Sequence, residues 1–90
     1  MKFTYDSAKN DSNLAKHGLP LSDAKLLDWN TAFSWIDERK NYGEERHIAL
    51  VPIGQRLYCV VYVESKIAKR IISLRKANNR EMKIYEEETY

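Results

Sequence analysis

The sequence predicts an α+β fold, a small antiparallel sheet with two N-terminal helices and one C-terminal helix. Two runs rich in Val, Ile and Tyr, Arg46–Ile53 and Leu57–Glu64, flank a turn around Gly54. This pattern is typical of a β-hairpin. Helix-type segments precede and follow the strand-rich region. Because sequential strands with short turns pair as neighbours, we expect a meander with helices mainly on one face.

The N-terminal third is expected to contain one strand and two helices. The alternation of Phe3 and Tyr5 predicts a strand over residues 1–5. Asp6 is a good N-cap for a helix that ends before Gly18, the residue type that favours a helix C-terminus. Ser22 is expected to cap a shorter second helix. These two helices are predicted over Ser7–His17 and Ser22–Asp28.

The remaining elements follow from alternation and turn signals. Phe33 and Trp35 alternate with smaller residues, and a polar segment containing Gly43 follows them. A turn at residues 65–66 separates the hairpin from another apolar run. Asn78 or Asn79 is suited to start a last helix. The predicted elements are strands over Thr31–Asp37 and Ile67–Leu74, and a helix reaching about Glu88.

Length and composition predict a single domain over residues 1–90. With 90 residues and 43% hydrophobic content, the chain can bury one modest core. No run approaches the ~20 apolar residues of a membrane helix, and the N-terminus lacks the apolar segment of a secretory signal. We therefore expect a cytoplasmic protein with no membrane association.

The cysteine and histidine content predicts neither a metal site nor a cofactor. Cys59 is the single cysteine and stands among Leu57, Val60 and Val61, as a small buried hydrophobe would. The two histidines do not combine with it in a zinc-binding pattern. Metal-dependent hydrolysis is therefore disfavoured.

Positive charge is concentrated in one segment. The net charge is +2, yet residues 65–83 hold seven Lys or Arg against one Glu, a net +6. Glu86, Glu87 and Glu88 follow in the last seven residues. A basic block beside acidic segments is typical of a surface for a polyanion, although a solvated lysine-rich face has the same composition.

Arginines suit the chemistry of RNA cleavage without a metal, which must stabilise extra negative charge on phosphate. The guanidinium stays charged and meets phosphate oxygens with two donors at once. Arg39 and Arg46 flank a polar loop, and Arg70 and Arg75 lie on or just after the last strand. An ideal strand places Arg70, Ile72 and Leu74 on one face and Lys69, Ile71, Ser73 and Arg75 on the other. Arg75 is then the candidate for the sheet face that stays open to solvent, while Arg70 is equally suited to pair with a carboxylate such as Glu45.

Other candidate side chains have simpler structural explanations. Histidine is a common general acid or base, but His17 stands at a predicted helix C-terminus, where a cation is favourable. His47, at the start of a strand, has a weaker claim on catalysis. Trp29 and Trp35 are expected in the core, which leaves Tyr42 and Tyr85 as the aromatic candidates for stacking on bases.

Several segments together resemble the BrnT family, the toxins of type II toxin–antitoxin modules. The resemblance runs in order through most of the chain. It rests on Tyr5, Asp6, Lys9, Asn13, Lys16, His17 and Gly18; on Asp37, Glu38 and Arg39; on residues 42–46; and on Arg70, Ile72, Ser73, Arg75, Lys76, Ala77, Glu81 and Tyr85.

The resemblance implies a twisted antiparallel sheet like that of the RelE ribonuclease toxins, and a bacterial endoribonuclease that inhibits growth. It also implies neutralisation by a BrnA-like antitoxin in a hetero-oligomer, which contacts operator DNA through the antitoxin. With the arginine pattern, it favours Arg46 and Arg75 as stabilisers of the transition state and Glu44 or Tyr85 in proton transfer. The expected RNA-binding residues are Arg39, Lys69, Arg70, Lys76 and Arg80.

Two alternatives use the same residues. In the first, the basic strip is a non-catalytic docking surface for antitoxin or nucleic acid that serves operon repression. In the second, the chain is an inactive toxin homologue retained for that repression. RNA cleavage by the purified chain, or its absence, separates both from the enzyme.

Overall fold

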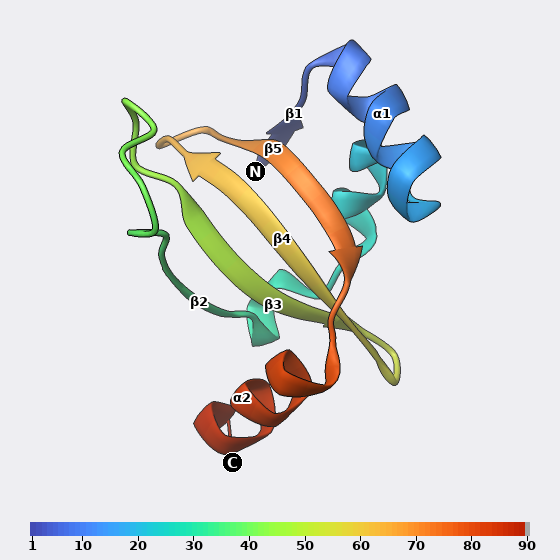
Figure 1. The fold of residues 1–90 in the computed structure, drawn as a ribbon, viewed down its shortest axis with the longest axis vertical. Helices are drawn as coiled ribbons and strands as arrows, with labels where there is room; N and C mark the ends of the chain where they lie inside the picture. The colour runs from blue at the N-terminus through green and yellow to red at the C-terminus, as the bar shows by residue number, and fades with distance from the viewer. Residues whose placement is uncertain (90) are drawn as a thin grey trace.

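The computed structural model describes residues 1–89 and contains one five-stranded sheet among them (Figure 1). The strands are β1 (Lys2–Thr4), β2 (Phe33–Ile36), β3 (His47–Ile53), β4 (Arg56–Glu64) and β5 (Ala68–Lys76). Their order across the sheet is β1-β5-β4-β3-β2. The predicted meander is confirmed for β2 to β5, whose neighbours pair antiparallel. The edge strand β1 instead pairs parallel to β5.

The first predicted helix is confirmed with its boundaries. Helix α1 spans Ser7–His17, and the Asp6 carboxylate accepts a hydrogen bond from the Lys9 N–H at 3.0 Å. Gly18 ends the helix with φ of 73°, in the left-handed region that glycine adopts without steric cost. Local sequence chemistry therefore determines both ends of α1.

The second predicted helix is only partly correct, because Leu21–Leu26 forms the 3-10 helix η1. Ser22 does not cap it, since the Ser22 N–H donates to the Asn10 side-chain oxygen at 3.1 Å. A segment of six residues suits the tighter i→i+3 pattern, and the chain becomes extended again at Leu27. A second 3-10 turn, η2 (Trp29–Thr31), includes the first residue of the strand predicted over Thr31–Asp37.

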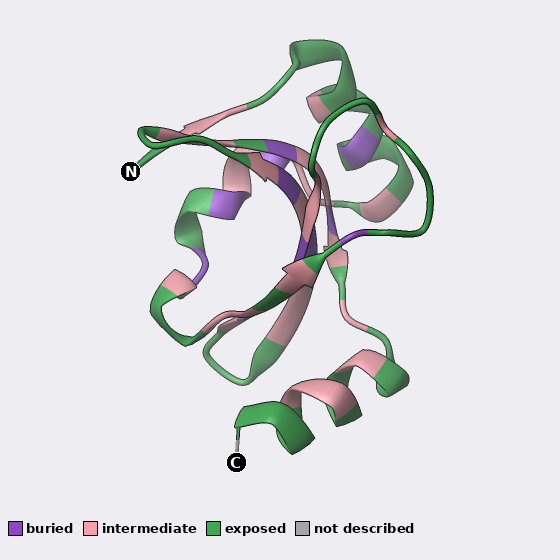
Figure 2. Ribbon diagram, turned by 90° about the vertical axis from the view of Figure 1, so that its left-hand side faces the viewer, coloured by how far each residue is buried: buried purple, intermediate pink, exposed green. Residues whose placement is uncertain are grey.

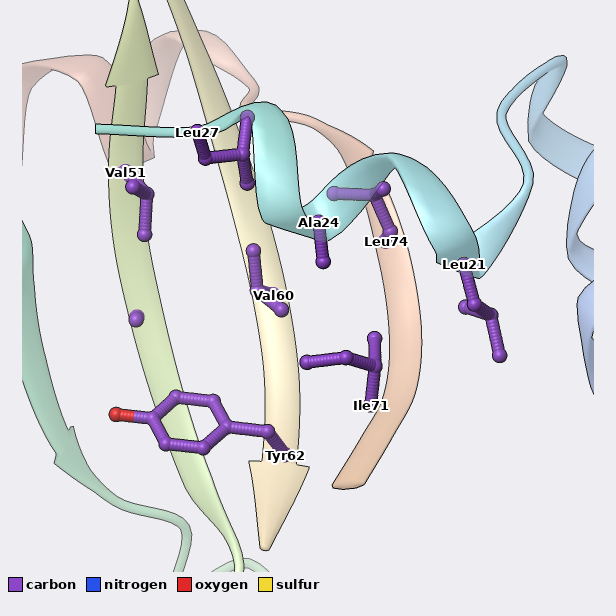
Figure 3. Close-up of a cluster of buried hydrophobic side chains, with 9 residues drawn as sticks. Leu21, Ala24, Leu27, Val51, Val60, Tyr62, Ile71 and Leu74 are labelled. Atoms are coloured by element: carbon purple, nitrogen blue, oxygen red, sulfur yellow. The ribbon is translucent and has the colours of Figure 1, made fainter. Parts of the chain in front are cut away.

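The main hydrophobic core lies between the sheet and η1. Figure 3 shows Leu21 and Ala24 of η1, and Leu27 just after it, packed over side chains from β3, β4 and β5. Each of these side chains is at most 9% exposed. Trp29 packs against the same cluster and donates its indole N–H to the Ala24 carbonyl at 2.8 Å. The expected core role of Trp29 is thus confirmed.

Helix α2 (Asn79–Thr89) packs on the opposite face of the sheet, near one end (Figures 1 and 2). Its Ile84 and Tyr85 contact a smaller buried cluster formed by Ile48, Leu50 and Cys59. The apolar side chains around this cluster are only partly buried, so this sheet face stays partly accessible beside α2. We call it the open face.

A register shift in β5 corrects the predicted arrangement of side chains. Val61 pairs with Ser73, whereas the next residue of β4, Tyr62, pairs with Ile71, so Ile72 is an extra residue. This β-bulge reverses the alternation within the strand. Ile71 and Leu74 consequently share the core face. Arg70, Ser73 and Arg75 lie opposite Val63, Val61 and Cys59 on the open face.

Candidate functional site

Three arginines line one hollow of the open face. The hollow, about 240 Å³, lies between the sheet and the first half of α2 and is lined by Trp35, Arg39, Ile48, Cys59, Val61, Arg75, Asn78, Arg80, Glu81 and Ile84. Arg39 comes from the loop after β2, Arg75 from β5 and Arg80 from α2. Its floor is apolar and its rim is basic. Such a hollow suits an anion with a hydrophobic neighbour.

Arg75 is held by a carboxylate from α2. Its Nη1 and Nη2 donate to the two carboxylate oxygens of Glu81, each at 2.8 Å. The same carboxylate accepts from the Asn78 N–H at 2.9 Å, while the Asn78 side chain accepts from the Glu81 N–H at 2.9 Å. This reciprocal capping box starts α2 and fixes Arg75 at once.

The pairing between Arg75 and Glu81 shifts both titrations. The hydrogen bonds from Arg75 lower the pKa of Glu81, and those to Glu81 raise the pKa of Arg75. Arg75 therefore remains a cation and Glu81 a carboxylate near neutral pH. The Nε–H of Arg75 has no partner among the described residues, so one edge of the guanidinium stays available to a phosphate.

Arg39 is positioned by the buried Asp37. Its Nε and Nη2 donate to the two carboxylate oxygens of Asp37, each at 2.8 Å. Tyr42 donates its hydroxyl to the same carboxylate at 2.9 Å, and the Arg39 N–H donates at 3.1 Å. The hydrogen bond from the Arg39 side chain is the main cause that lowers the pKa of Asp37. The Asp37 side chain is 1% exposed and that of Arg39 is 69% exposed, so a buried anion anchors a cation that faces solvent.

A second basic cluster lies farther along the open face. The Glu44 carboxylate pairs with Arg46 Nε at 3.3 Å and with Arg70 Nη2 at 2.5 Å. The Arg46 guanidinium also lies 4.3 Å from the centre of the Tyr42 ring, a cation–π geometry. The loop carrying Glu44 and the helix α2 lie toward opposite ends of the sheet (Figures 1 and 2). Glu44 and Arg46 therefore do not line the hollow that contains Arg75.

Tyr85 and the two lysines of β5 also lie apart from that hollow. Tyr85 donates its hydroxyl to the Thr31 carbonyl at 2.6 Å and faces a different hollow, beside the β3–β4 turn. Lys69 lies opposite Glu64, pairs with it at 2.6 Å, and packs over the Trp29 ring on the core face. The prediction that Lys69 shares a face with Arg75 is wrong, because the bulge intervenes. Lys76 lies opposite Tyr58 on the core face.

Several side chains have the structural roles that the sequence favoured. Cys59 is buried, and burial raises the pKa of its thiol to about 11, which disfavours a thiolate. His17 occupies the last turn of α1, as expected. His47 stacks on Tyr62 and lies 3.3 Å from the Glu45 carboxylate.

The sequence pattern did not identify the anchoring carboxylates. Asp37 entered only as part of a family resemblance, and Glu81 only as a matching position. The motif Asn78-x-x-Glu81 is a capping signal that could have placed Glu81 at a helix start. Nothing local reveals that Asp37 is buried, because its burial depends on the loop that ends at Arg46.

Within residues 1–89, no three His, Cys, Asp or Glu side chains are grouped so that they could hold a metal ion. In the same residues, no helix is long and apolar enough to cross a membrane.

Comparison with known proteins identifies the family. Residues 5–81, from the end of β1 to the first turn of α2, match the family model described as "Ribonuclease toxin, BrnT, of type II toxin-antitoxin system". No curated protein matches the chain. The matched region contains Asp37, Arg39, Arg75 and Glu81, and ends before Tyr85. The resemblance seen in the sequence is thus confirmed, and the chain belongs to the BrnT family of ribonuclease toxins, which act in type II systems with an antitoxin protein as partner.

Proposed function

We propose that this chain is a metal-independent endoribonuclease that binds the scissile phosphate of RNA among Arg39, Arg75 and Arg80. The observation that carries the proposal is the convergence of these three side chains on one hollow. Two of them are fixed by carboxylates yet keep N–H donors without a described partner. Arg80 has no hydrogen-bond or ion-pair partner within residues 1–89.

Such arginines supply what RNA cleavage needs most. When the 2′-hydroxyl attacks the neighbouring phosphorus, its proton is removed and negative charge accumulates on the non-bridging phosphate oxygens. The bond from phosphorus to the 5′-oxygen then breaks, and this oxygen takes up a proton, which leaves a 2′,3′-cyclic phosphate and a free 5′-hydroxyl. Donors that are already oriented stabilise this charge without reorganising, and one such donor contributes about 10²- to 10³-fold in rate. The anchoring of Arg39 by Asp37 and of Arg75 by Glu81 supplies this preorganisation.

The proton that leaves the 2′-hydroxyl needs an acceptor. Glu81 is the carboxylate that lines the hollow, and a phosphate that binds Arg75 would weaken its hold on Glu81. The pKa of Glu81 would then rise toward the range of an effective base. We assign proton transfer first to Glu81, with Glu44 and Tyr85, the groups favoured by the sequence, as alternatives.

The second basic cluster extends the same surface. Arg46 and Arg70 share the open face with Arg75 but lie farther along it. We assign them to the flanking phosphates of a bound RNA strand. Arg46 then contributes to RNA binding in addition to any role at the reacting phosphate.

The biological setting of the proposal follows the family. A BrnA-like antitoxin neutralises the toxin in a hetero-oligomer, growth stops when the toxin is free, and the complex represses its operon through the antitoxin. The RelE-like character of the fold belongs to the same proposal, supported by a β2–β5 meander that has α1 and η1 on one face.

The test is RNA cleavage by the purified chain in EDTA, with Arg75→Ala, Arg39→Ala and Arg46→Ala beside the wild type. Lys25→Ala, an exposed change on η1, controls for lost positive charge. We expect cleavage in EDTA, reduced at least 100-fold in Arg75→Ala and unchanged in Lys25→Ala. RNA bound but never cut would favour the non-catalytic module, and cleavage undiminished in a folded Arg39→Ala/Arg75→Ala variant would exclude the assigned site.

Proton transfer is tested separately through the pH dependence of cleavage. Glu81→Gln should abolish the acidic limb of the pH–rate profile, whereas Glu44→Gln should keep that limb. The opposite pattern would move the base to Glu44.

A further inference from the structure

A second hollow lies on the open face, on the other side of α2 from the arginines. Its volume is about 580 Å³, within the range of small-ligand sites. It lies between the β3–β4 turn and the second half of α2 and is lined by Pro52, Gly54, Gln55, Arg56, Leu57, Met82, Tyr85 and Glu86. Among these residues, only Tyr85 has a role in the proposed ribonuclease reaction, as an alternative group for proton transfer.

Apolar side chains from the sheet and from α2 form part of the lining of this hollow. Pro52 and Leu57 pair across β3 and β4, and Met82, which is 43% exposed, faces them from α2. The Tyr85 ring is held in place because its hydroxyl donates to the Thr31 carbonyl. A fixed tyrosine ring beside apolar side chains suits a planar ring system, which gains stacking contact at little entropic cost.

The rim of the hollow carries donors and acceptors with no internal partner. The side chains of Gln55, Arg56 and Glu86 are exposed and form no hydrogen bond within residues 1–89. A guanidinium, an amide and a carboxylate complement a planar ring whose edges carry both donors and acceptors. Guanine matches this set best, because its O6 and N7 accept from an arginine and its amino group donates to a carboxylate.

The position of the hollow fits the same RNA strand. Leu57 faces this hollow and Cys59 the arginine hollow, and residues two apart on one strand are separated by about 7 Å. The two hollows are divided by α2, whose exposed Lys83 lies by helical spacing on the outer side. That separation of about 7 Å lies beneath α2, which packs on the sheet through Ile84 and Tyr85. An RNA strand with its phosphate among the arginines would instead pass over α2 near Lys83, across a helix about 10 Å wide, and reach the second hollow with the base of a more distant nucleotide.

We propose that the hollow between the β3–β4 turn and α2 is a base-specific subsite that binds guanine on the far side of α2 from the cleaved bond. It rests on the proposed ribonuclease function and adds a selectivity that the arginines, which contact only phosphate, cannot supply. Arg56 is the specificity residue, Glu86 is its partner for the amino group, and Met82 and Tyr85 provide the stacking walls.

Binding is tested first, without any dependence on cleavage. Guanosine, adenosine, cytidine and uridine are titrated separately into the ¹⁵N-labelled full chain, with inorganic phosphate as a probe of the arginine hollow. We expect guanosine to shift the amides of residues 54–57 and 82–86 most strongly, and phosphate to shift those around Arg75. Guanosine shifts that are absent, or spread elsewhere, would overturn the proposal.

Selectivity is tested with otherwise identical RNA oligonucleotides that carry or lack a single guanine. The measured quantity is the ratio of kcat/KM values for the two substrates, because a general loss of electrostatic attraction cancels in it. We expect Arg56→Ala to reduce this ratio about tenfold or more, the scale of one lost bidentate base contact, and Lys25→Ala to leave it unchanged. A ratio that Arg56→Ala preserves would refute the subsite.

The two proposals fail separately. If no RNA is cleaved but guanosine binds at residues 54–57, the ribonuclease assignment falls and the base site stands. If RNA is cleaved but kcat/KM is the same with and without guanine, the ribonuclease assignment stands and the base subsite falls. Protection of this hollow by antitoxin, with no response to guanosine, would show that a protein occupies it and would also overturn the subsite.

Discussion

Replacing Asp37 by Asn tests whether one buried carboxylate organises the phosphate site. Asp37 accepts four hydrogen bonds, three of them from Arg39 and one from Tyr42. In the variant an amide NH₂ replaces one carboxylate oxygen and meets the Arg39 Nη2–H and the Tyr42 hydroxyl, both of which are donors. The substitution therefore removes the charge-assisted hydrogen bond from Arg39 Nη2, and it places the new amide donor against the Arg39 and Tyr42 donors.

The expected magnitude follows from the burial of these groups. A hydrogen bond to a charged group contributes about 1.5 to 3 kcal/mol, and an unsatisfied buried group costs about 1 to 3 kcal/mol. Because 69% of the Arg39 side chain is exposed, water replaces part of what it loses. We expect Asp37→Asn to lower the free energy of unfolding by about 2 to 4 kcal/mol.

Urea denaturation at pH 7 measures this loss, with Asp11→Asn on the exposed side of α1 as the matched control. The same variant should cleave RNA more slowly, since Arg39 is no longer fixed. A change below about 0.5 kcal/mol, comparable to an ordinary surface substitution, would refute the argument that Asp37 anchors the loop.

The pH dependence provides a second measurement of the same anchor. The pKa of Asp37 is lowered from its ordinary value of 3.8, chiefly by the hydrogen bonds from Arg39. Its stabilisation is therefore complete above about pH 4 and is lost as the pH falls through the lowered pKa. The difference in stability between wild type and Asp37→Asn should be constant from pH 5 to 8 and shrink in acid. A difference that grew on acidification would contradict the assignment.

Further predictions concern the remaining contacts. Asn13→Ala removes a buried side chain that forms hydrogen bonds with the Leu19 carbonyl and with both backbone groups of Leu74. The free energy of unfolding, measured by urea denaturation, should fall by about 2 to 4 kcal/mol while RNA cleavage is unchanged. An unchanged midpoint of urea unfolding would contradict this. Glu81→Gln should accelerate amide exchange in residues 79–89 while β3 and β4 keep their protection, and uniform acceleration would show that α2 is not a separate unit. Because Arg39, Arg46, Arg70 and Arg75 are each paired with a carboxylate, RNA affinity should depend weakly on salt, with about two to three phosphates apparent in the slope. Antitoxin binding should protect the β2 edge and the acidic end of α2 at Glu86 to Glu88; unchanged exchange at both places would exclude them from the interface.

The elements that the sequence predicted correctly are those defined by local chemistry. Asp6 and Gly18 fix both ends of α1 through a side-chain cap and a left-handed backbone, and the hairpin turn at Gly54 is specified in the same way. The parallel pairing of β1 with β5 depends on contacts between distant residues, so no pattern within Met1–Tyr5 predicts it. A 3-10 helix forms where residues 22–28 were predicted to be α-helical, and the Ser22 N–H donates to the distant Asn10 side chain.

The candidate site was harder to predict than the fold, because one extra residue decides it. Strict alternation places Arg70 and Arg75 on opposite faces, and a single bulged residue at Ile72 returns both to the open face. A bulge leaves no reliable sequence signal when the extra residue is itself apolar. The arginines were identified from their chemistry, but which of them share a surface required the register.

The net charge of only +2 is low for a protein that binds RNA, and the pairing of arginines with carboxylates contributes to it. Each of Asp37, Glu44 and Glu81 cancels charge on the open face, and each also fixes the direction of at least one guanidinium. Free arginines would attract RNA more strongly at long range but would lose side-chain entropy on binding a phosphate. Fixed arginines bind the ground state more weakly and keep their donors oriented toward charge that develops only in the transition state. The arrangement therefore favours catalysis over affinity, which is the balance expected of a surface that cuts RNA and releases it.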